Sequence, residues 1–93
     1  MKLLWTAQSW DEYVYWLNVD PEMARKINML LRDIRRDPFL GLGKPEPLRG
    51  NFQGWWSRRI TQEHRLIYRV HGAGENRHVE ITQCGSHYER RSS

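Results

Sequence analysis

The hydrophobic positions in the first third of the chain follow a helical period. A short apolar segment at residues 2–6 predicts a strand, and Ser9 with Glu12 forms a capping-box pattern at the start of a helix. The apolar positions of this helix recur at i, i+3, i+4 and i+7: Trp10, Tyr13, Val14 and Leu17. This spacing predicts a single apolar face, and the helix is expected to end between residues 18 and 20.

A second helix is predicted directly after the first. Asp20 is a suitable N-cap, and Pro21 suits the first helical position because an N–H there has no helical partner. The apolar side chains that follow fall on one stripe: Met23, Ile27, Leu30, Leu31 and Ile34. The basic side chains lie mostly off that stripe: Arg25, Lys26, Arg32, Arg35 and Arg36. Asp37-Pro38 ends the pattern.

The second half of the chain predicts a loop and then strands. Residues 39–54 are interrupted by glycine and proline too often for a helix or long strand, which indicates a structured loop. From residue 55 the period is two, and one set of alternating positions reads Trp56, Arg58 and Ile60, then Leu66, Tyr68 and Val70, then Val79 and Ile81. A glycine-rich turn lies at 72–74.

The order of these elements predicts an α+β fold. Two N-terminal helices are expected to pack on one face of a mostly antiparallel sheet, within one domain that spans residues 1–93. Arg59 and Arg65 lie on neighbouring strands and share a sheet face if the turn between them centres on Gln62. The face away from the helices is then left to these two arginines and to whatever they bind.

Composition adds information about partners and compartment. Fifteen Lys and Arg against eleven Asp and Glu give a net charge of +4, which favours a polyanionic partner, either nucleic acid or an acidic protein segment. Cys84 is the single cysteine, so no intrachain disulfide forms, and we expect it to be a packing residue. No apolar run approaches the ~20 residues that span a bilayer. A cytoplasmic protein is therefore expected.

The candidate chemistry is metal-free cleavage of RNA. The sequence has no zinc-spaced Cys/His cluster, no phosphate-binding loop and no carboxylate cluster typical of a magnesium nuclease, so no cofactor is expected. RNA carries its own nucleophile, the 2′-hydroxyl, and needs a base, fixed positive charge and an acid. Glu46 between two prolines, the pair Arg59 and Arg65, and His87 have suitable side chains. Each also has an ordinary interpretation as a surface residue.

Five sequence segments together resemble one protein family. Residues 10–13 (WDEY), 43–48 (GKPEPL), 56–61 (WSRRIT), 63–68 (EHRLIY) and the pair His87-Tyr88 are similar to the YoeB (Txe) toxins of the RelE/ParE superfamily. The similarity runs in order from about residue 1 to residue 88. It implies a microbial-ribonuclease-like fold and ribosome-dependent cleavage of mRNA in the A site, which leaves a cyclic phosphate or 3′-phosphate and a 5′-hydroxyl.

The resemblance also implies roles and partners. Glu46 is expected to be the general base, Arg65 the transition-state stabiliser and His87 the general acid, while substrate contacts are expected from Arg49, Arg59 and Tyr88. The implied partners are a YefM-like antitoxin with an acidic C-terminal segment, the ribosome with its mRNA, and a second copy of the chain. Operator DNA is reached only through the antitoxin.

Three features depart from the family pattern and leave alternatives open. Arg49 stands where the family usually has lysine, residues 89–93 continue past the His-Tyr pair as an expected tail, and the hairpin around residues 72–77 is longer than usual. One alternative is a ParE-like binding toxin that acts on another target, such as DNA gyrase. Another is a toxin fold that has lost its activity and binds only antitoxin and operator DNA.

Overall fold

The computed structural model describes residues 1–85. Its helices are α1 (Ala7–Val19) and α2 (Pro21–Arg36), and its strands are β1 (Lys2–Trp5), β2 (Glu46–Pro47), β3 (Trp56–Arg59), β4 (Arg65–His71) and β5 (His78–Cys84). Short 3₁₀ turns lie at Gly50–Phe52 and Gly74–Asn76. The tail at residues 89–93 and the pair His87-Tyr88 lie outside the described residues.

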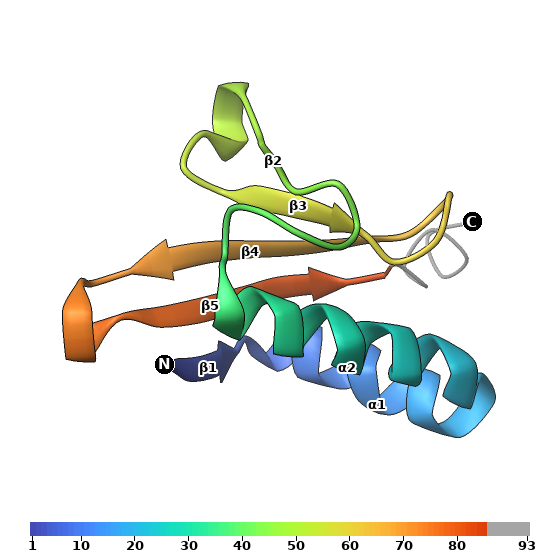
Figure 1. The fold of residues 1–93 in the computed structure, drawn as a ribbon. Coiled ribbons are helices and arrows are strands. Elements are labelled where there is room, and N and C mark those ends of the chain that lie inside the picture. The colour runs from blue at the N-terminus through green and yellow to red at the C-terminus, as the bar shows by residue number, and fades with distance from the viewer. Residues whose placement is uncertain (86–93) are drawn as a thin grey trace.

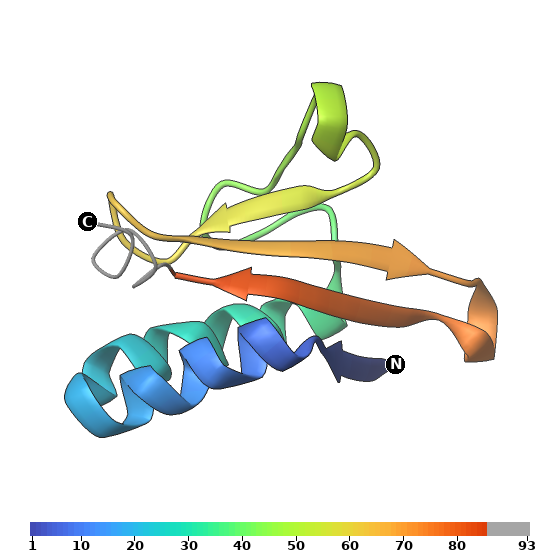
Figure 2. The same ribbon diagram turned by 180° about the vertical axis from the view of Figure 1, so that it is seen from behind.

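The five strands form one sheet in the order β1-β5-β4-β3-β2. The outer strand β1 runs parallel to β5, and every other neighbouring pair is antiparallel. Both helices cover the same face of this sheet, and β2 lies at the edge far from them (Figures 1 and 2). The predicted α+β architecture with a mostly antiparallel sheet is therefore confirmed.

The core lies between α2 and the helix-facing side of the sheet. Every residue of the predicted α2 stripe is buried, together with Ala24, and the basic residues off the stripe are exposed. From the sheet, the fully buried side chains Leu66, Tyr68, Val79 and Ile81 pack against the stripe. The period-two pattern thus identified the core-facing side of β4 and β5 correctly.

The predicted face of α1 was wrong for Trp10 and Leu17, while Tyr13 and Val14 are partly buried and Tyr13 packs against the core. Trp10 and Leu17 are 48% and 46% exposed, whereas the side toward β5 is formed by Ser9, Glu12 and Trp16. Polar side chains are buried there because the backbone of β5 binds them: the Ser9 hydroxyl donates to the carbonyl of Ile81 at 2.6 Å. An apolar period cannot detect a face of this kind.

The predicted capping box of α1 was also wrong by three residues. The N-cap is Thr6, whose hydroxyl accepts from the Ser9 N–H at 3.0 Å, while the Ser9 hydroxyl accepts from the Thr6 N–H at 3.0 Å. Glu12 is instead fully buried. Asp20 holds the N-cap position of α2 as predicted, although its side chain forms no capping hydrogen bond.

A buried arginine fastens the predicted loop to the helices. Arg58 is fully buried on the helix side of β3, and its guanidinium contacts the Asp33 carboxylate at 2.6 Å, the Tyr68 hydroxyl at 3.0 Å and the Asp37 carbonyl at 2.6 Å. Further bonds reach the carbonyls of Leu40 and Leu42. These contacts fix the start of the loop at 39–54, which also contributes the short strand β2.

Cys84 is fully buried at the end of β5, as expected for a packing residue. Its thiol donates to the carbonyl of Ser9 at 3.2 Å, and burial raises the pKa of the thiol. Neither helix is long and apolar enough to cross a membrane; this holds for residues 1–85.

Candidate active site

Two arginines lie opposite each other where β3 and β4 meet their connecting turn. Arg59 and Arg65 are direct register partners, as the turn centred on Gln62 predicts. Directly opposite residues of an antiparallel pair have Cβ atoms about 4.5–5.5 Å apart and point to the same face. Since Leu66 and Tyr68 point into the core, both arginines lie on the face away from the helices.

The Arg65 guanidinium is held against the turn. Its Nη1 donates to the carbonyl oxygens of Thr61 at 3.0 Å, Gln62 at 2.9 Å and His64 at 3.3 Å. These acceptors are neutral, and within residues 1–85 neither Arg65 nor Arg59 forms a salt bridge. The sheet face therefore carries two positive charges that form no salt bridge among the described residues, one of them fixed in direction.

A tight backbone turn brings Glu46 to the same sheet. Gly43 and Lys44 both have positive φ angles, +79° and +53°, and the Gly43 carbonyl accepts the Arg59 N–H at 2.7 Å. A side chain at Gly43 would lie 2.9 Å from the Arg59 carbonyl oxygen, so glycine is required for this approach. The turn is followed by Pro45 and by β2, which pairs with β3.

Glu46 belongs to a row of side chains that crosses four strands. It is the register partner of Ser57, which pairs with Ile67, which in turn pairs with Gln83 of β5. This row is adjacent to the Arg59–Arg65 row, because Ser57 and Arg59 are two residues apart on one strand. Glu46 is exposed. The structure thus brings the predicted base and both predicted phosphate ligands to one face.

The remaining predicted site residues are placed less closely. Arg49 is exposed beyond β2, at the start of the 3₁₀ turn Gly50–Phe52. His87 and Tyr88 lie outside the described residues. Within residues 1–85, no three histidine, cysteine or carboxylate side chains gather closely enough to hold a metal ion.

Two residues of α1 hold the strand end that precedes His87, and sequence reasoning missed their role. The Glu12 carboxylate accepts the Cys84 N–H at 2.8 Å, and the Trp16 indole N–H donates to the Cys84 carbonyl at 3.0 Å. Gly85 then packs so closely that a Cβ atom there would lie 2.8 Å from the Trp16 indole nitrogen. Ser9, Glu12 and Trp16 have helical spacing, but only the contact with β5 reveals their function.

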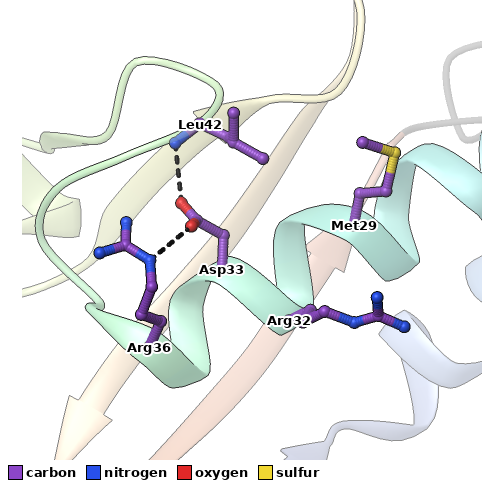
Figure 3. Close-up of a pocket in the computed structure, with 5 residues that line it drawn as sticks. All are labelled: Met29, Arg32, Asp33, Arg36 and Leu42. Atoms are coloured by element: carbon purple, nitrogen blue, oxygen red, sulfur yellow. Dashed lines mark hydrogen bonds and ion pairs between the residues drawn. The ribbon is translucent and has the colours of Figure 1, made fainter.

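One pocket lies away from this face, between α2 and the loop that follows it. Met29, Arg32, Asp33, Arg36 and Leu42 line a space of about 270 Å³ (Figure 3). Its acid is already engaged, since the Asp33 carboxylate accepts the Leu42 N–H at 2.8 Å and the Arg36 side chain at 3.0 Å. This pocket therefore has a structural explanation and supplies no free base.

A smaller pocket lies between α2 and the end of β3, where Arg59 contributes to its lining. Its volume is about 190 Å³, and its lining includes Lys26 and Met29 of α2 together with Arg59 of β3. Lys26 adds a third positive charge near the edge of the sheet. The region around Arg59 is suited to an anion, and a carboxylate at Glu46 lies one row away.

The fold and this arginine-bearing face define a small α+β protein of the RelE-like toxin class. A family model described as "YoeB-like toxin of bacterial type II toxin-antitoxin system" matches residues 5–88. The toxin YoeB of Escherichia coli is 51% identical over 88 residues, which cover 95% of this chain and 100% of that protein. The chain therefore belongs to the YoeB-like toxin family.

Solved structures agree with this assignment. A YoeB/ParE toxin from Agrobacterium tumefaciens superposes with a TM-score of 0.88 at 56% identity, covering 95% of this chain and 100% of that one. The toxin in a heterotetrameric YoeB–YefM complex from Staphylococcus aureus gives 0.82 at 40% identity, and a YoeB dimer from the same species gives 0.81 at 39%. Each covers 95% of this chain and 98% of the other.

Proposed function

We propose that this toxin is a metal-free endoribonuclease that cleaves mRNA in the ribosomal A site, in the cytoplasm. The observation that carries the proposal is the Arg59–Arg65 pair, two like charges placed directly opposite each other on an open sheet face. Such a pair is destabilising in the free protein. An anion bound between the side chains removes that cost, and the phosphate of a nucleic acid backbone is the anion that suits guanidinium geometry.

The proposed reaction uses one base, one phosphate site and one acid. The Glu46 carboxylate takes the proton of the 2′-hydroxyl, and the 2′-oxygen attacks the adjacent phosphorus. Arg65 and Arg59 stabilise the added negative charge on the phosphorane oxygens. The bond from phosphorus to the 5′-oxygen breaks as His87 donates its proton to that oxygen. The products are a 2′,3′-cyclic phosphate and a 5′-hydroxyl.

Support for Arg65 as the main stabiliser comes from its fixed direction. Three carbonyl contacts hold one guanidinium nitrogen, so the side chain loses little freedom when a phosphate binds. Substrate contacts from Arg49 and Tyr88 complete the proposal. The positive charge of Arg49 extends the face along the RNA.

The proposed partners follow from the family and from charge. A solved relative forms a complex with YefM, and another is a dimer. We propose that this chain likewise binds a YefM-like antitoxin, whose acidic segment complements a net charge of +4, and that it forms a homodimer. Contact with operator DNA then occurs only through the antitoxin.

The test is a cleavage assay on a defined mRNA, with and without ribosomes. Ribosome-dependent cleavage by the parent protein, lost in His87→Ala, is the expected result. Cleavage of naked mRNA at the same rate would contradict the ribosome requirement. If the parent binds ribosomes but cuts nothing, the alternative of a binding-only toxin replaces this proposal.

A further inference from the structure

A second feature of the open sheet face lies one row beyond Glu46. Trp55 precedes β3, and its indole lies against the guanidinium of Arg69 on β4, with 5.4 Å between the guanidinium carbon and the ring centroid. The strand register places the two residues opposite each other, because Trp56 is the partner of Tyr68 and the strands β3 and β4 run antiparallel. Trp55 is half-buried and Arg69 is exposed.

This pair lies on the same face as the candidate active site. Trp55, Ser57 and Arg59 alternate along one strand, as do Arg65, Ile67 and Arg69 along the other. Two residues along a strand advance by about 6.8 Å. The indole–guanidinium pair is therefore one row from Glu46 and two rows from Arg65 on the same face.

Arg69 forms no salt bridge within the described part of the chain. Its neighbour across the sheet is Glu80, but the Glu80 carboxylate bonds to the His71 imidazole at 2.8 Å, and no salt bridge of Arg69 is present. The guanidinium thus presents a flat, positively charged surface supported by an aromatic ring. Both surfaces are of the kind on which unpaired nucleobases stack.

We propose that Trp55 and Arg69 form a base-stacking subsite for a nucleotide next to the cleaved phosphodiester. This inference rests on the proposed function, since it deepens the description of the same RNA-binding face. Glu46 and the arginine pair act on the phosphodiester, whereas the Trp55–Arg69 pair holds a neighbouring base. The subsite orients the strand, and it favours no base by hydrogen bonding because stacking accepts every base.

The experiment measures binding of a single-stranded 2′-O-methyl RNA hexanucleotide, which lacks the nucleophile and stays intact. Trp55→Leu is expected to weaken binding at least about fivefold, while Trp55→Phe keeps an aromatic ring and binds within about twofold of the parent. Arg69→Ala weakens binding as well. The matched control is Arg77→Ala. Arg77 makes the same contact with Phe39, also at 5.4 Å, and the Phe39 ring lies 4.9 Å from the ring of the helix-side Trp56 at a tilt of 51°.

A second series separates base stacking from charge. Hexanucleotides that lack one base at each position in turn are compared with the intact strand, for the parent, Trp55→Leu and Arg69→Ala. The expected result is one position at which removal of the base weakens binding to the parent. At that position, Trp55→Leu and Arg69→Ala bind the abasic strand as tightly as they bind the intact strand. Equal losses for every abasic strand, a parent-like Trp55→Leu and Arg69→Ala, or a parent that does not bind would each overturn the inference.

The outcome is distinguishable from failure of the proposed function. If the parent protein cuts mRNA on ribosomes but shows no coupling between these residues and any base, the ribonuclease proposal stands and the subsite proposal is wrong. If the parent never cuts but shows the coupling, the subsite proposal stands and the ribonuclease proposal is wrong. Circular dichroism tests whether Trp55→Leu folds. If this variant does not fold, Arg69→Ala decides the test, since the Arg69 side chain is exposed.

Discussion

Arg59 and Arg65 face each other across β3 and β4 as direct register partners, and neither forms a salt bridge within residues 1–85. Like charges placed in this way lower the stability of a sheet. The cost is small enough for the fold to tolerate, and the Arg65 contacts with three turn carbonyls offset part of it. The arrangement agrees with the anionic ligand that we propose for this face.

The first prediction concerns Arg65. Replacing it by alanine removes the fixed guanidinium from the phosphate, so Arg65→Ala is expected to lose about 2–4 kcal/mol of transition-state stabilisation. The single-turnover rate of mRNA cleavage on ribosomes measures this loss. Arg65→Lys keeps the charge but lacks the planar fork and should recover only part of the rate. A loss below tenfold in Arg65→Ala would remove the residue from this role.

The second prediction concerns Glu46 as the base. Glu46→Gln keeps the size of the side chain but cannot accept a proton, so the cleavage rate should fall by about a hundredfold or more. The side chain is exposed, and the free energy of unfolding should therefore change by no more than about 0.5 kcal/mol.

The control for this variant is Glu75→Gln, an exposed carboxylate in the 3₁₀ turn between β4 and β5. It carries the same change of charge and should cleave as the parent does. Equal rates for Glu46→Gln and the parent would assign the base to another residue.

The third prediction concerns the buried ion pair of Arg58 and Asp33. Arg58→Ala leaves the Asp33 carboxylate without its buried partner and should destabilise the fold by about 3–5 kcal/mol. Arg36→Ala is the matched control, because Arg36 binds the same carboxylate from the surface, and its loss should cost no more than about 1 kcal/mol. Chemical denaturation measures both variants. Similar costs for the two would contradict the role of Arg58 in holding the loop.

The same carboxylate predicts a pH dependence. The hydrogen bond from the Leu42 N–H, helped by Arg58 and Arg36, lowers the pKa of Asp33 from 3.8 to about 2. A carboxyl with a lowered pKa in the folded state stabilises the fold above its unfolded pKa. The contribution is complete above pH 3.8 and is lost as the pH falls through about 2. In Asp33→Asn, the free energy of unfolding should lose this part of its acid dependence.

Sequence reasoning succeeded where one element determines its own pattern. The apolar stripe of α2 needs only a helical period and one sheet to cover, and all five of its predicted core residues are buried. The register of Arg59 with Arg65 follows from the odd number of residues in the turn between them. Both features depend on neighbours in the sequence, so a periodic pattern is enough to reveal them.

Sequence reasoning failed where residues far apart in the sequence form hydrogen bonds with each other. Glu12 and Cys84 are 72 positions apart, and their contact helps to explain a carboxylate on the buried face of α1. The alternating pattern placed Arg58 on the core-facing side of its strand. Its hydrogen-bond partners come from α2 and the loop, and a periodic pattern within one strand cannot predict contacts with other elements. The strand β2 has only two residues, too few for a pattern.

The last prediction concerns that distant contact. Glu12 accepts the Cys84 N–H, and Cys84 lies three residues before His87 along the chain. Glu12→Leu leaves the buried N–H without this acceptor and should cost about 1–3 kcal/mol of stability. Glu12→Gln retains an oxygen acceptor and should lose less. If the contact also directs the chain toward the site, Glu12→Leu cleaves more slowly than Glu12→Gln at a temperature where both are folded. Asp11→Asn, an exposed neighbour on α1, is the control, and equal cleavage by all three variants would limit Glu12 to stability.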